Sequence, residues 1–230
     1  MLKSKELRAK AWESLRGKYW MAFLVAIVLG ALGAVGGGMI TCSQDILDIV
    51  NVVDLSAVDH TVLLGAAVLT VAALLITVIG LLLSIFIGGA AKVGLCNYFI
   101  KNTDSRPSFK DAFSGFKVKY SRNIGTLLLV AIKVFLWTLL LVIPGIIKTY
   151  EYAIIPYILA DEPAISSGDA FRKARELMKG NKWRLFKLEF SFIGWFALSF
   201  FTLGIGAFFL LPYVEAAKAE FYVELKNKQA

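Results

Sequence analysis

The chain has 230 residues, of which 58% are hydrophobic and 18% are charged, and its formal net charge is +8. Soluble domains are usually about 45–50% apolar, with about a quarter of their residues charged, so this composition indicates a membrane protein. The positive charge lies beside apolar runs, where it can face anionic lipid headgroups, and this argues against nucleic acid as a partner.

The N-terminal segment is basic and has a helical pattern. Leu7, Ala11, Leu15 and Tyr19 recur every four residues and would form one stripe of a helix. We expect this helix to lie in the membrane interface, with its basic side chains among the headgroups. The alternatives are a soluble amphipathic helix and a cleaved signal peptide, but the long basic stretch and the glycines at 36–38 fit a signal peptide poorly.

The first apolar run, 21–40, is followed by an expected loop, 41–60, and then by a second run, 61–91. Runs of about 20 residues are long enough to cross the hydrocarbon core. Lys and Arg beside a span resist translocation, so we expect the loop, which has neither residue, to face outward. The loop carries only acidic charges, at Asp45, Asp48, Asp54 and Asp59.

Small residues recur every four positions at Gly30, Ala34 and Gly38, and again at Ala90 and Gly94. This spacing lets helices approach closely. We expect it to serve internal packing, with homodimerisation as the alternative. The two cysteines, Cys42 and Cys96, should fall near opposite ends of the first hairpin, so we expect no disulfide between them.

Two later basic segments, 112–120 and 174–183, look like copies of 11–20. Segment 174–183 shares its Ala, Glu, Gly and Trp positions with 11–20, while 112–120 matches more weakly. Ser108 and Ser166 are each followed three residues later by Asp, which is a helix-start signal. We therefore predict three repeat units, roughly 1–100, 101–163 and 164–230, in a single membrane domain spanning 1–230.

The second apolar unit, 124–160, is interrupted by Pro144 and Gly145, and the third, 185–214, by a Gly-rich stretch at 202–206. As one helix, 124–160 would be about 55 Å long, which is too long for one span. Either it crosses once and continues on the surface, or it forms a helical hairpin. The hairpin leaves all three basic segments on the cytoplasmic side, as the positive-inside rule requires.

The expected fold is therefore all-α: a polytopic helical membrane protein with three repeats of an interfacial amphipathic helix plus a helical hairpin. It would have about six membrane helices and both termini in the cytoplasm. The arms of the second and third hairpins are short enough to leave open whether they cross the bilayer fully.

Several short motifs resemble a bacterial family of integral membrane proteins, the domain-of-unknown-function family 975. The residues that carry the resemblance are Leu136-Trp137, 142–148, Tyr152, 177–182, 191–195 and Pro212-Tyr213, and the resemblance extends over nearly the whole chain. It implies a multi-pass protein of the bacterial plasma membrane. The family has no established activity, so the resemblance implies no catalytic residues.

Lys133 and Glu215 are the charged residues expected deepest in the membrane. Both lie about ten residues from their hairpin turns. Charges within a membrane tend to face the bundle and find partners, so we predict an intramembrane ion pair between them. The alternative is that Lys133 extends toward the interface or contacts backbone carbonyls.

Other charged residues are expected at the interfaces. Lys148 and Glu151 should form a local pair near the outer interface, and Glu189 should be a solvated carboxylate near the inner one. We predict basic contacts to anionic lipid headgroups at Arg16, Lys18, Lys117, Lys119, Lys173, Lys179 and Lys182.

No catalytic, cofactor or metal motif is present. His60 is the single histidine, and a lone histidine without a cluster of carboxylate or cysteine ligands does not make a metal site. We therefore expect a non-enzymatic protein that acts through anionic lipid, through other membrane proteins or as a homo-oligomer. The alternative is a small transporter or lipid-handling protein with a polar site at Lys133 and Glu215. An intramembrane enzyme has the least support.

Overall fold

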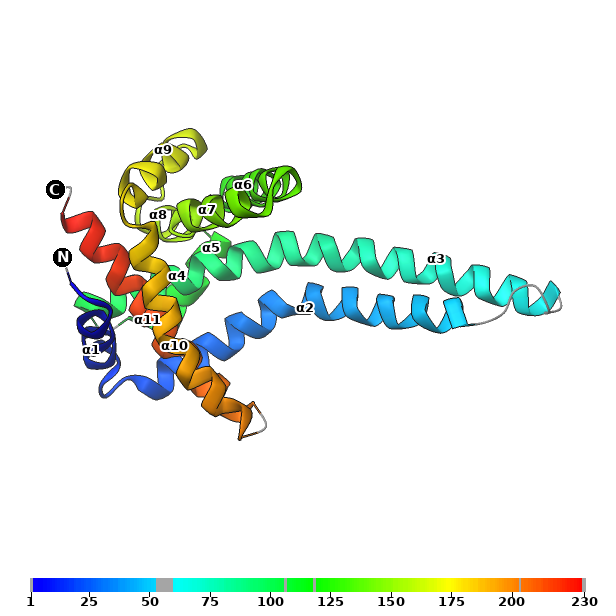
Figure 1. Ribbon diagram of the computed structural model, residues 1–230, viewed down its shortest axis with the longest axis horizontal. Coiled ribbons are helices and arrows are strands. Elements are labelled where there is room, and N and C mark those ends of the chain that lie inside the picture. The colour runs from blue at the N-terminus through cyan, green and yellow to red at the C-terminus, as the bar shows by residue number, and fades with distance from the viewer. Residues whose placement is uncertain (1, 53–59, 106, 118, 203, 229–230) are drawn as a thin grey trace. The chain divides into compact units, whose positions relative to one another are not determined.

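A computed structural model describes residues 2–52, 60–105, 107–117, 119–202 and 204–228, and these form helices joined by short turns, without strands. The helices are α1 (Ser4–Leu15), α2 (Tyr19–Val52), α3 (His60–Leu83), the π-helical turn η1 (Ser84–Gly88), α4 (Gly89–Asp104), the 3-10 turn η2 (Phe109–Phe113), α5 (Ser114–Lys117), α6 (Tyr120–Leu140), α7 (Val142–Tyr152), α8 (Ile155–Asp161), α9 (Ser167–Met178), α10 (Lys182–Phe200) and α11 (Ile205–Asn227) (Figure 1). The predicted all-α class is thus confirmed for the described residues.

The chain divides into two compact units. Unit 1 consists of Met1–Leu29 with Ala90–Ala230, and unit 2 is Gly30–Gly89. The three predicted repeat units are defined by sequence similarity and not by compactness, so the two compact units do not test them. The repeats stay a prediction.

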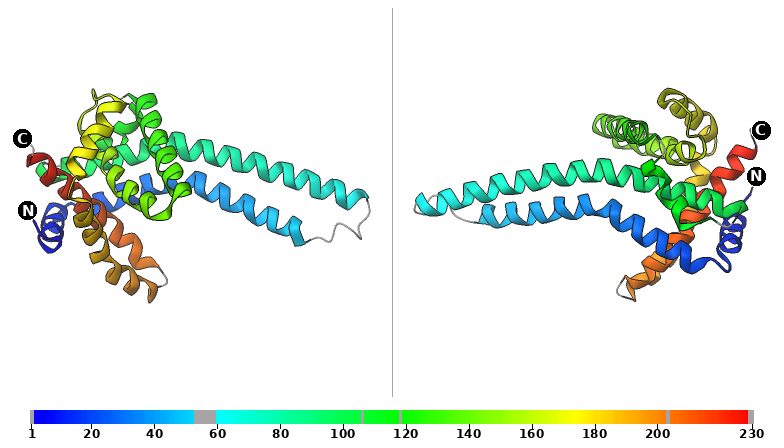
Figure 2. Two further views of the ribbon diagram at one scale, coloured as in Figure 1. Left: turned by 45° about the horizontal axis from the view of Figure 1, so that its top comes forward. Right: turned by 180° about the vertical axis from the view of Figure 1, so that it is seen from behind.

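Unit 2 is a long antiparallel helical hairpin, with α2 and α3 side by side (Figures 1 and 2). The hydroxyls of Ser43 and Thr77 hydrogen-bond across it at 2.7 Å. Its two helices approach closely at Gly33 and Gly88, where an added Cβ on Gly88 would lie 3.5 Å from the Gly33 carbonyl oxygen. At Gly30 and Gly38 an added Cβ would meet open space, so those two glycines do not pack as expected.

The expected loop 41–60 is largely helical, which is a correction. Helix α2 continues to Val52, and the Thr41 hydroxyl donates to the carbonyls of Gly37 and Gly38 within it. No proline or glycine interrupts the chain between Thr41 and Val52, so the helix has no local reason to end at residue 40. Asp45 and Asp48 are therefore helical, while Asp54 and Asp59 lie outside the described residues.

The core of unit 1 forms where α1, α4, α8, α9 and α11 bury their apolar faces. Helix α4 meets the η2–α5 segment through Gly94 and Gly115 without intervening side chains. A Cβ added to Gly94 would lie 2.0 Å from the carbonyl oxygen of Ala112, so only glycine permits this approach. The prediction that Gly94 serves internal packing is thus confirmed.

The predicted interruptions of the second and third apolar units are hairpin turns. The backbone between α6 and α7 is extended at Leu141, three residues before Pro144, which lies in the first turn of α7. Proline is tolerated there because the first turn of a helix needs few N–H donors. Between α10 and α11 the chain turns at Gly204, whose φ of 82° is a left-handed conformation that suits glycine.

Among the described residues, three helices are long and apolar enough to cross a membrane: Tyr19–Val50, His60–Asp104 and Tyr120–Leu140. Length and composition alone define these candidate spans. They suit association with a membrane, and they are half as many as the six membrane helices expected from the sequence.

Candidate functional site

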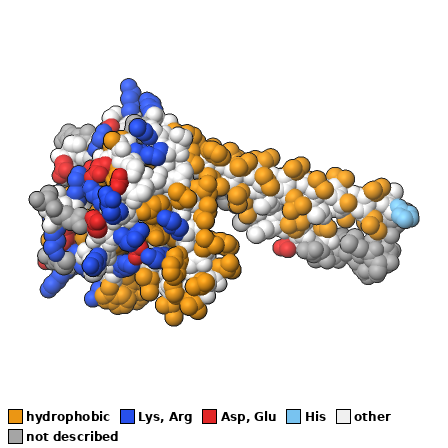
Figure 3. Space-filling model, turned by 90° about the horizontal axis from the view of Figure 1, so that it is seen from above, with side chains coloured by type: hydrophobic (Ala, Val, Ile, Leu, Met, Phe, Trp, Pro, Cys, Tyr) orange, Lys and Arg blue, Asp and Glu red, His pale blue; other side chains and the backbone are white. Residues whose placement is uncertain are grey.

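Charged and apolar side chains are separated on the surface of unit 1. Figure 3 shows Lys, Arg, Asp and Glu side chains gathered over this unit, with hydrophobic side chains along one margin. Exposed apolar residues gather at the two hairpin ends, at Leu139–Ile143 of α6–α7 and at Phe201 and Ile205 of α10–α11. Exposed apolar residues gathered in this way mark a contact with a membrane or with another protein.

A short connector precedes each hairpin: residues 16–18 before α2, 117–119 before α6 and 179–181 before α10. Each connector places one residue in the left-handed region, with φ of 78° at Gly17, 46° at Lys119 and 75° at Gly180. This conformation ends one helix and lets the next begin within three residues.

The connectors present unpaired cations. Arg16, Lys117, Lys119 and Lys179 are exposed, and within the described residues none of the four forms a salt bridge. Tryptophan follows two of the connectors at Trp20 and Trp183, whose exposed fractions are 72% and 62%. Cations next to exposed tryptophan are typical of a membrane–water interface.

The remaining three predicted lipid contacts already have partners in the chain. The Lys18 ammonium donates to the carbonyl of Ser105 at 2.8 Å. Lys173 pairs with Glu162 and Lys182 pairs with Glu151. These three cations are therefore less available to an external phosphate than those of Arg16, Lys117, Lys119 and Lys179.

The structure does not bring Lys133 and Glu215 together. Lys133 Nζ lies over the ring of Phe171 on α9, 3.7 Å from the ring centroid. Glu215 instead accepts from Lys92 at 2.8 Å and from the Tyr157 hydroxyl at 3.1 Å. The expected pair is absent because Lys133 on α6 contacts Phe171 of α9, while Glu215 on α11 meets Lys92 of α4.

Lys92 and Tyr157 are the partners that sequence reasoning missed. Lys92 follows directly after the apolar run 61–91, and a cation at the end of such a run was the available signal. Nothing in the sequence pattern marks Tyr157. The transporter and lipid-handling alternative rested on a joint polar site at Lys133 and Glu215, and it loses that basis.

Glu151 is a buried carboxylate at the base of the second hairpin. It accepts from Lys148 at 2.7 Å, as the predicted local pair requires, and also from Lys182, while Arg175 Nε lies 3.9 Å away. Burial by itself would raise the pKa of Glu151, but the hydrogen bonds from Lys148 and Lys182 hold it below its ordinary value. Because Lys182 adjoins a connector, Lys148 and Glu151 do not lie at the far end of the hairpin as expected.

Glu189 marks the base of the third hairpin. It pairs with Lys218 at 2.8 Å and accepts from the Tyr150 hydroxyl at 3.0 Å. The expected solvated carboxylate is therefore a bridging one. Through these two contacts it connects α10 with α11 and with α7.

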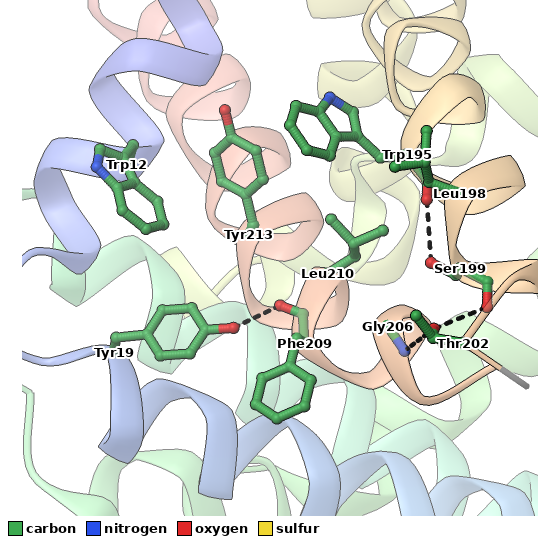
Figure 4. Close-up of a pocket in the computed structure, with 10 residues that line it drawn as sticks. All are labelled: Trp12, Tyr19, Trp195, Leu198, Ser199, Thr202, Gly206, Phe209, Leu210 and Tyr213. Carbon is green, nitrogen blue, oxygen red and sulfur yellow. Dashed lines mark hydrogen bonds between the residues drawn. The ribbon is translucent and has the colours of Figure 1, made fainter.

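An aromatic groove lies beside the third hairpin, with a volume of about 560 Å³ (Figure 4). It is lined by Trp12, Tyr19, Trp195, Leu198, Ser199, Thr202, Gly206, Phe209, Leu210 and Tyr213. The Tyr19 hydroxyl donates to the Phe209 carbonyl at 2.6 Å, and the Ser199 and Thr202 hydroxyls bond to backbone carbonyls of their own turn. With these three hydroxyls bonded to backbone carbonyls, the groove presents a mostly apolar wall.

Metal-ligand geometry is lacking in the described part of the chain, where no three His, Cys, Asp or Glu side chains converge. Cys42 is exposed and Cys96 is buried, and both are free thiols.

Residues 138–229 match the model of a family described as Protein of unknown function (DUF975). The resemblance carried by the short motifs is thus confirmed for this part of the chain, which begins in α6 and includes α7 to α11. Neither the curated proteins nor the solved structures compared with the chain give a match.

Proposed function

We propose that the protein is a non-enzymatic, multi-pass protein of the bacterial plasma membrane that organises the membrane by binding anionic lipid headgroups. The observation that carries this proposal is the set of exposed, unpaired cations on the three connectors. Each lies at the start of a hairpin, and each can contribute about 1 kcal/mol to the attraction of an anionic leaflet. Contacts with other membrane proteins or with a second copy remain the alternative mode of action.

The proposed topology has both termini and all three connectors in the cytoplasm, with the three repeats contributing about six membrane helices. Helices α1 and α9 support the repeat, because each has 12 residues and is followed by a glycine in the left-handed region. The lack of Lys and Arg in the sequence of residues 41–60 supports an outward-facing end for the first hairpin. The proposed cytoplasmic segment at Arg106 lies outside the described residues.

The lipid proposal is tested by neutralising one cation on each connector, with Arg16→Gln, Lys117→Gln and Lys179→Gln combined. The matched control is Lys5→Gln, Lys110→Gln and Lys228→Gln, which removes three exposed cations outside the connectors. Protein purified from membranes containing phosphatidylglycerol is assayed for retained lipid by mass spectrometry across a salt titration.

The connector variant should lose most of its retained phosphatidylglycerol at moderate salt. The three lost charges should weaken the binding free energy by at most about 3 kcal/mol. The control should retain it as the unchanged protein does. Equal loss in both variants would show that net charge, rather than the connectors, attracts the lipid. No loss in either would overturn the proposal.

A further inference from the structure

The two arms of the third hairpin carry their last charged residues at a similar distance from the turn. Between these residues and the turn, both arms are uncharged. On α10 the last charge before the turn is Glu189, and on α11 the first charge after it is Glu215. Glu189 pairs with Lys218 and Glu215 pairs with Lys92, so this level is fixed by two ion pairs. The chain between them, 190–214, has no ionisable Lys, Arg, Asp, Glu or His.

The arms beyond that level are short. Residues 190–201 and 205–214 rise by about 18 Å and about 15 Å at 1.5 Å per residue. The hydrocarbon core is about 30 Å thick, so the turn reaches roughly its middle. For comparison, the uncharged stretches 19–44 and 61–91 of the first hairpin would measure about 39 Å and about 46 Å, which is enough to cross.

The second hairpin is shorter still. Its innermost charges are Lys133 and Lys148, and the chain between them has only 14 residues. Lys133 lies over Phe171 of α9, and Lys148 pairs with Glu151, which contacts Lys182, so both charges lie near the amphipathic α9 and the start of α10. The apolar end therefore projects about 10 Å beyond that level.

Both hairpin ends have the chemistry of a surface in hydrocarbon. Phe201 is 87% exposed and Ile143 is 73% exposed. At the third turn, the N–H groups of Thr202 and Gly204 donate to the Ser199 carbonyl, and that of Gly206 donates to the Thr202 hydroxyl. Such internal satisfaction is what a turn needs where no water is present, since each unsatisfied backbone group there costs several kcal/mol.

We infer that the hairpins α6–α7 and α10–α11 are re-entrant: both enter the cytoplasmic leaflet, turn within the hydrocarbon and return to the same side. Only the first hairpin then crosses the bilayer. The inference rests on the proposed cytoplasmic position of the connectors. Its consequence is an asymmetric insertion, because the two crossing helices occupy both leaflets, while the four arms of the re-entrant hairpins occupy only the cytoplasmic one.

The test places single cysteines at the hairpin ends, with Phe201→Cys and Ile143→Cys in a Cys42→Ala background that keeps the buried Cys96. A membrane-impermeant maleimide is applied to intact cells and to inverted vesicles. Lys179→Cys is the control for the cytoplasmic side and Asp45→Cys is the control for the outer side. Positions 201 and 143 should stay unlabelled from both sides, while each control is labelled from one.

Each other outcome has a separate meaning. Labelling of position 201 or 143 in intact cells would show that the hairpin crosses, and labelling only in inverted vesicles would show that it does not insert; either overturns the inference. Labelling of Lys179→Cys in intact cells would instead overturn the proposed topology, and hence the proposed function.

A depth measurement completes the test. A nitroxide attached at position 201 should collide more often with oxygen, which concentrates in the bilayer centre, than with a water-soluble nickel complex. A nitroxide at position 179 should show the opposite preference. Equal, low collision rates with both reagents at position 201 would indicate burial against protein and would contradict a lipid-embedded turn.

Discussion

Lys92 and Glu215, which are 123 residues apart in the chain, bring their charged groups to 2.8 Å and join the start of α4 to α11. Their side chains are 40% and 15% exposed, and the Tyr157 hydroxyl completes the carboxylate's hydrogen bonds. A pair formed between such distant elements fixes how α4 meets α11 in the core of unit 1. Removing one partner leaves the other charged and poorly solvated.

We expect Lys92→Met or Glu215→Leu alone to lower the free energy of unfolding by about 2 kcal/mol, below the ~3–5 kcal/mol of a fully buried pair because Lys92 is partly exposed. The double variant should recover much of this loss, which a double-mutant cycle by thermal unfolding in detergent would measure. Neutralising the exposed pair Asp169–Arg172 is the control, with an expected effect of about 0–1 kcal/mol. Additive losses at Lys92 and Glu215 would contradict the coupling.

Gly145 allows α6 and α7 to meet at the second hairpin. A Cβ on this residue would lie 2.3 Å from Thr138 Oγ1 and 2.7 Å from Thr138 Cα, so the backbone would have to move. Gly145→Ala should destabilise the protein by about 1–3 kcal/mol through overpacking. Gly125→Ala on the same α6 meets open space and should instead stabilise it slightly, by up to about 1 kcal/mol. Equal unfolding temperatures for the two variants would refute the close approach.

In the left-handed connector residues, replacing glycine should destabilise the protein, and introducing glycine should stabilise it. Gly180→Ala should cost about 1–2 kcal/mol, because an L side chain is strained at a φ of 75°. Lys119→Gly should stabilise the protein, since lysine already occupies that region at a φ of 46°. Gly194→Ala, in the middle of α10 with open space around it, is the control. Chemical denaturation of the three variants gives the comparison.

The carboxylate of Glu151 should contribute a pH-dependent term to stability. Its pKa in the folded protein lies below the ordinary value of 4.5, so its contribution is fully present above that value and is lost as the pH falls through the lowered pKa. Glu151→Gln should therefore lower the melting temperature most at neutral pH, and the gap from the unchanged protein should narrow in acid. The exposed Asp45→Asn should show no such narrowing. A constant gap for Glu151→Gln would contradict the assignment.

Periodicity and turn chemistry in the sequence were sufficient for the helices and for two of the turns. The recurrence of Leu7, Ala11 and Leu15 predicted α1, and all three side chains are buried in it. The Pro144–Gly145 signal located a hairpin but misplaced its turn by three residues, because proline is accommodated within the first turn of α7 and only the preceding Leu141 leaves the helix. The extent of α2 was missed, since its polar end looks like a loop by composition.

Partner choice was less predictable than secondary structure. The local pair of Lys148 and Glu151 follows from spacing along one helix and is present at 2.7 Å. The pair of Lys133 and Glu215 was inferred from similar depth in two hairpins, and depth says nothing about which arm faces which. Because α4 packs against α11, Glu215 pairs with Lys92. Lys133 instead lies over the ring of Phe171 on α9.

The sequence by itself determined that this protein is helical, apolar enough for a membrane and basic at the start of each hairpin, because these properties depend on residue type and period. The tertiary structure decided which partners Glu189, Glu215, Lys133 and Lys148 find, and the proposed depth of the second and third hairpins depends on these partners. Lys148 pairs with Glu151 on its own helix, as local spacing predicts, but the partners of Glu189, Glu215 and Lys133 lie on other helices, and the local sequence pattern does not identify them.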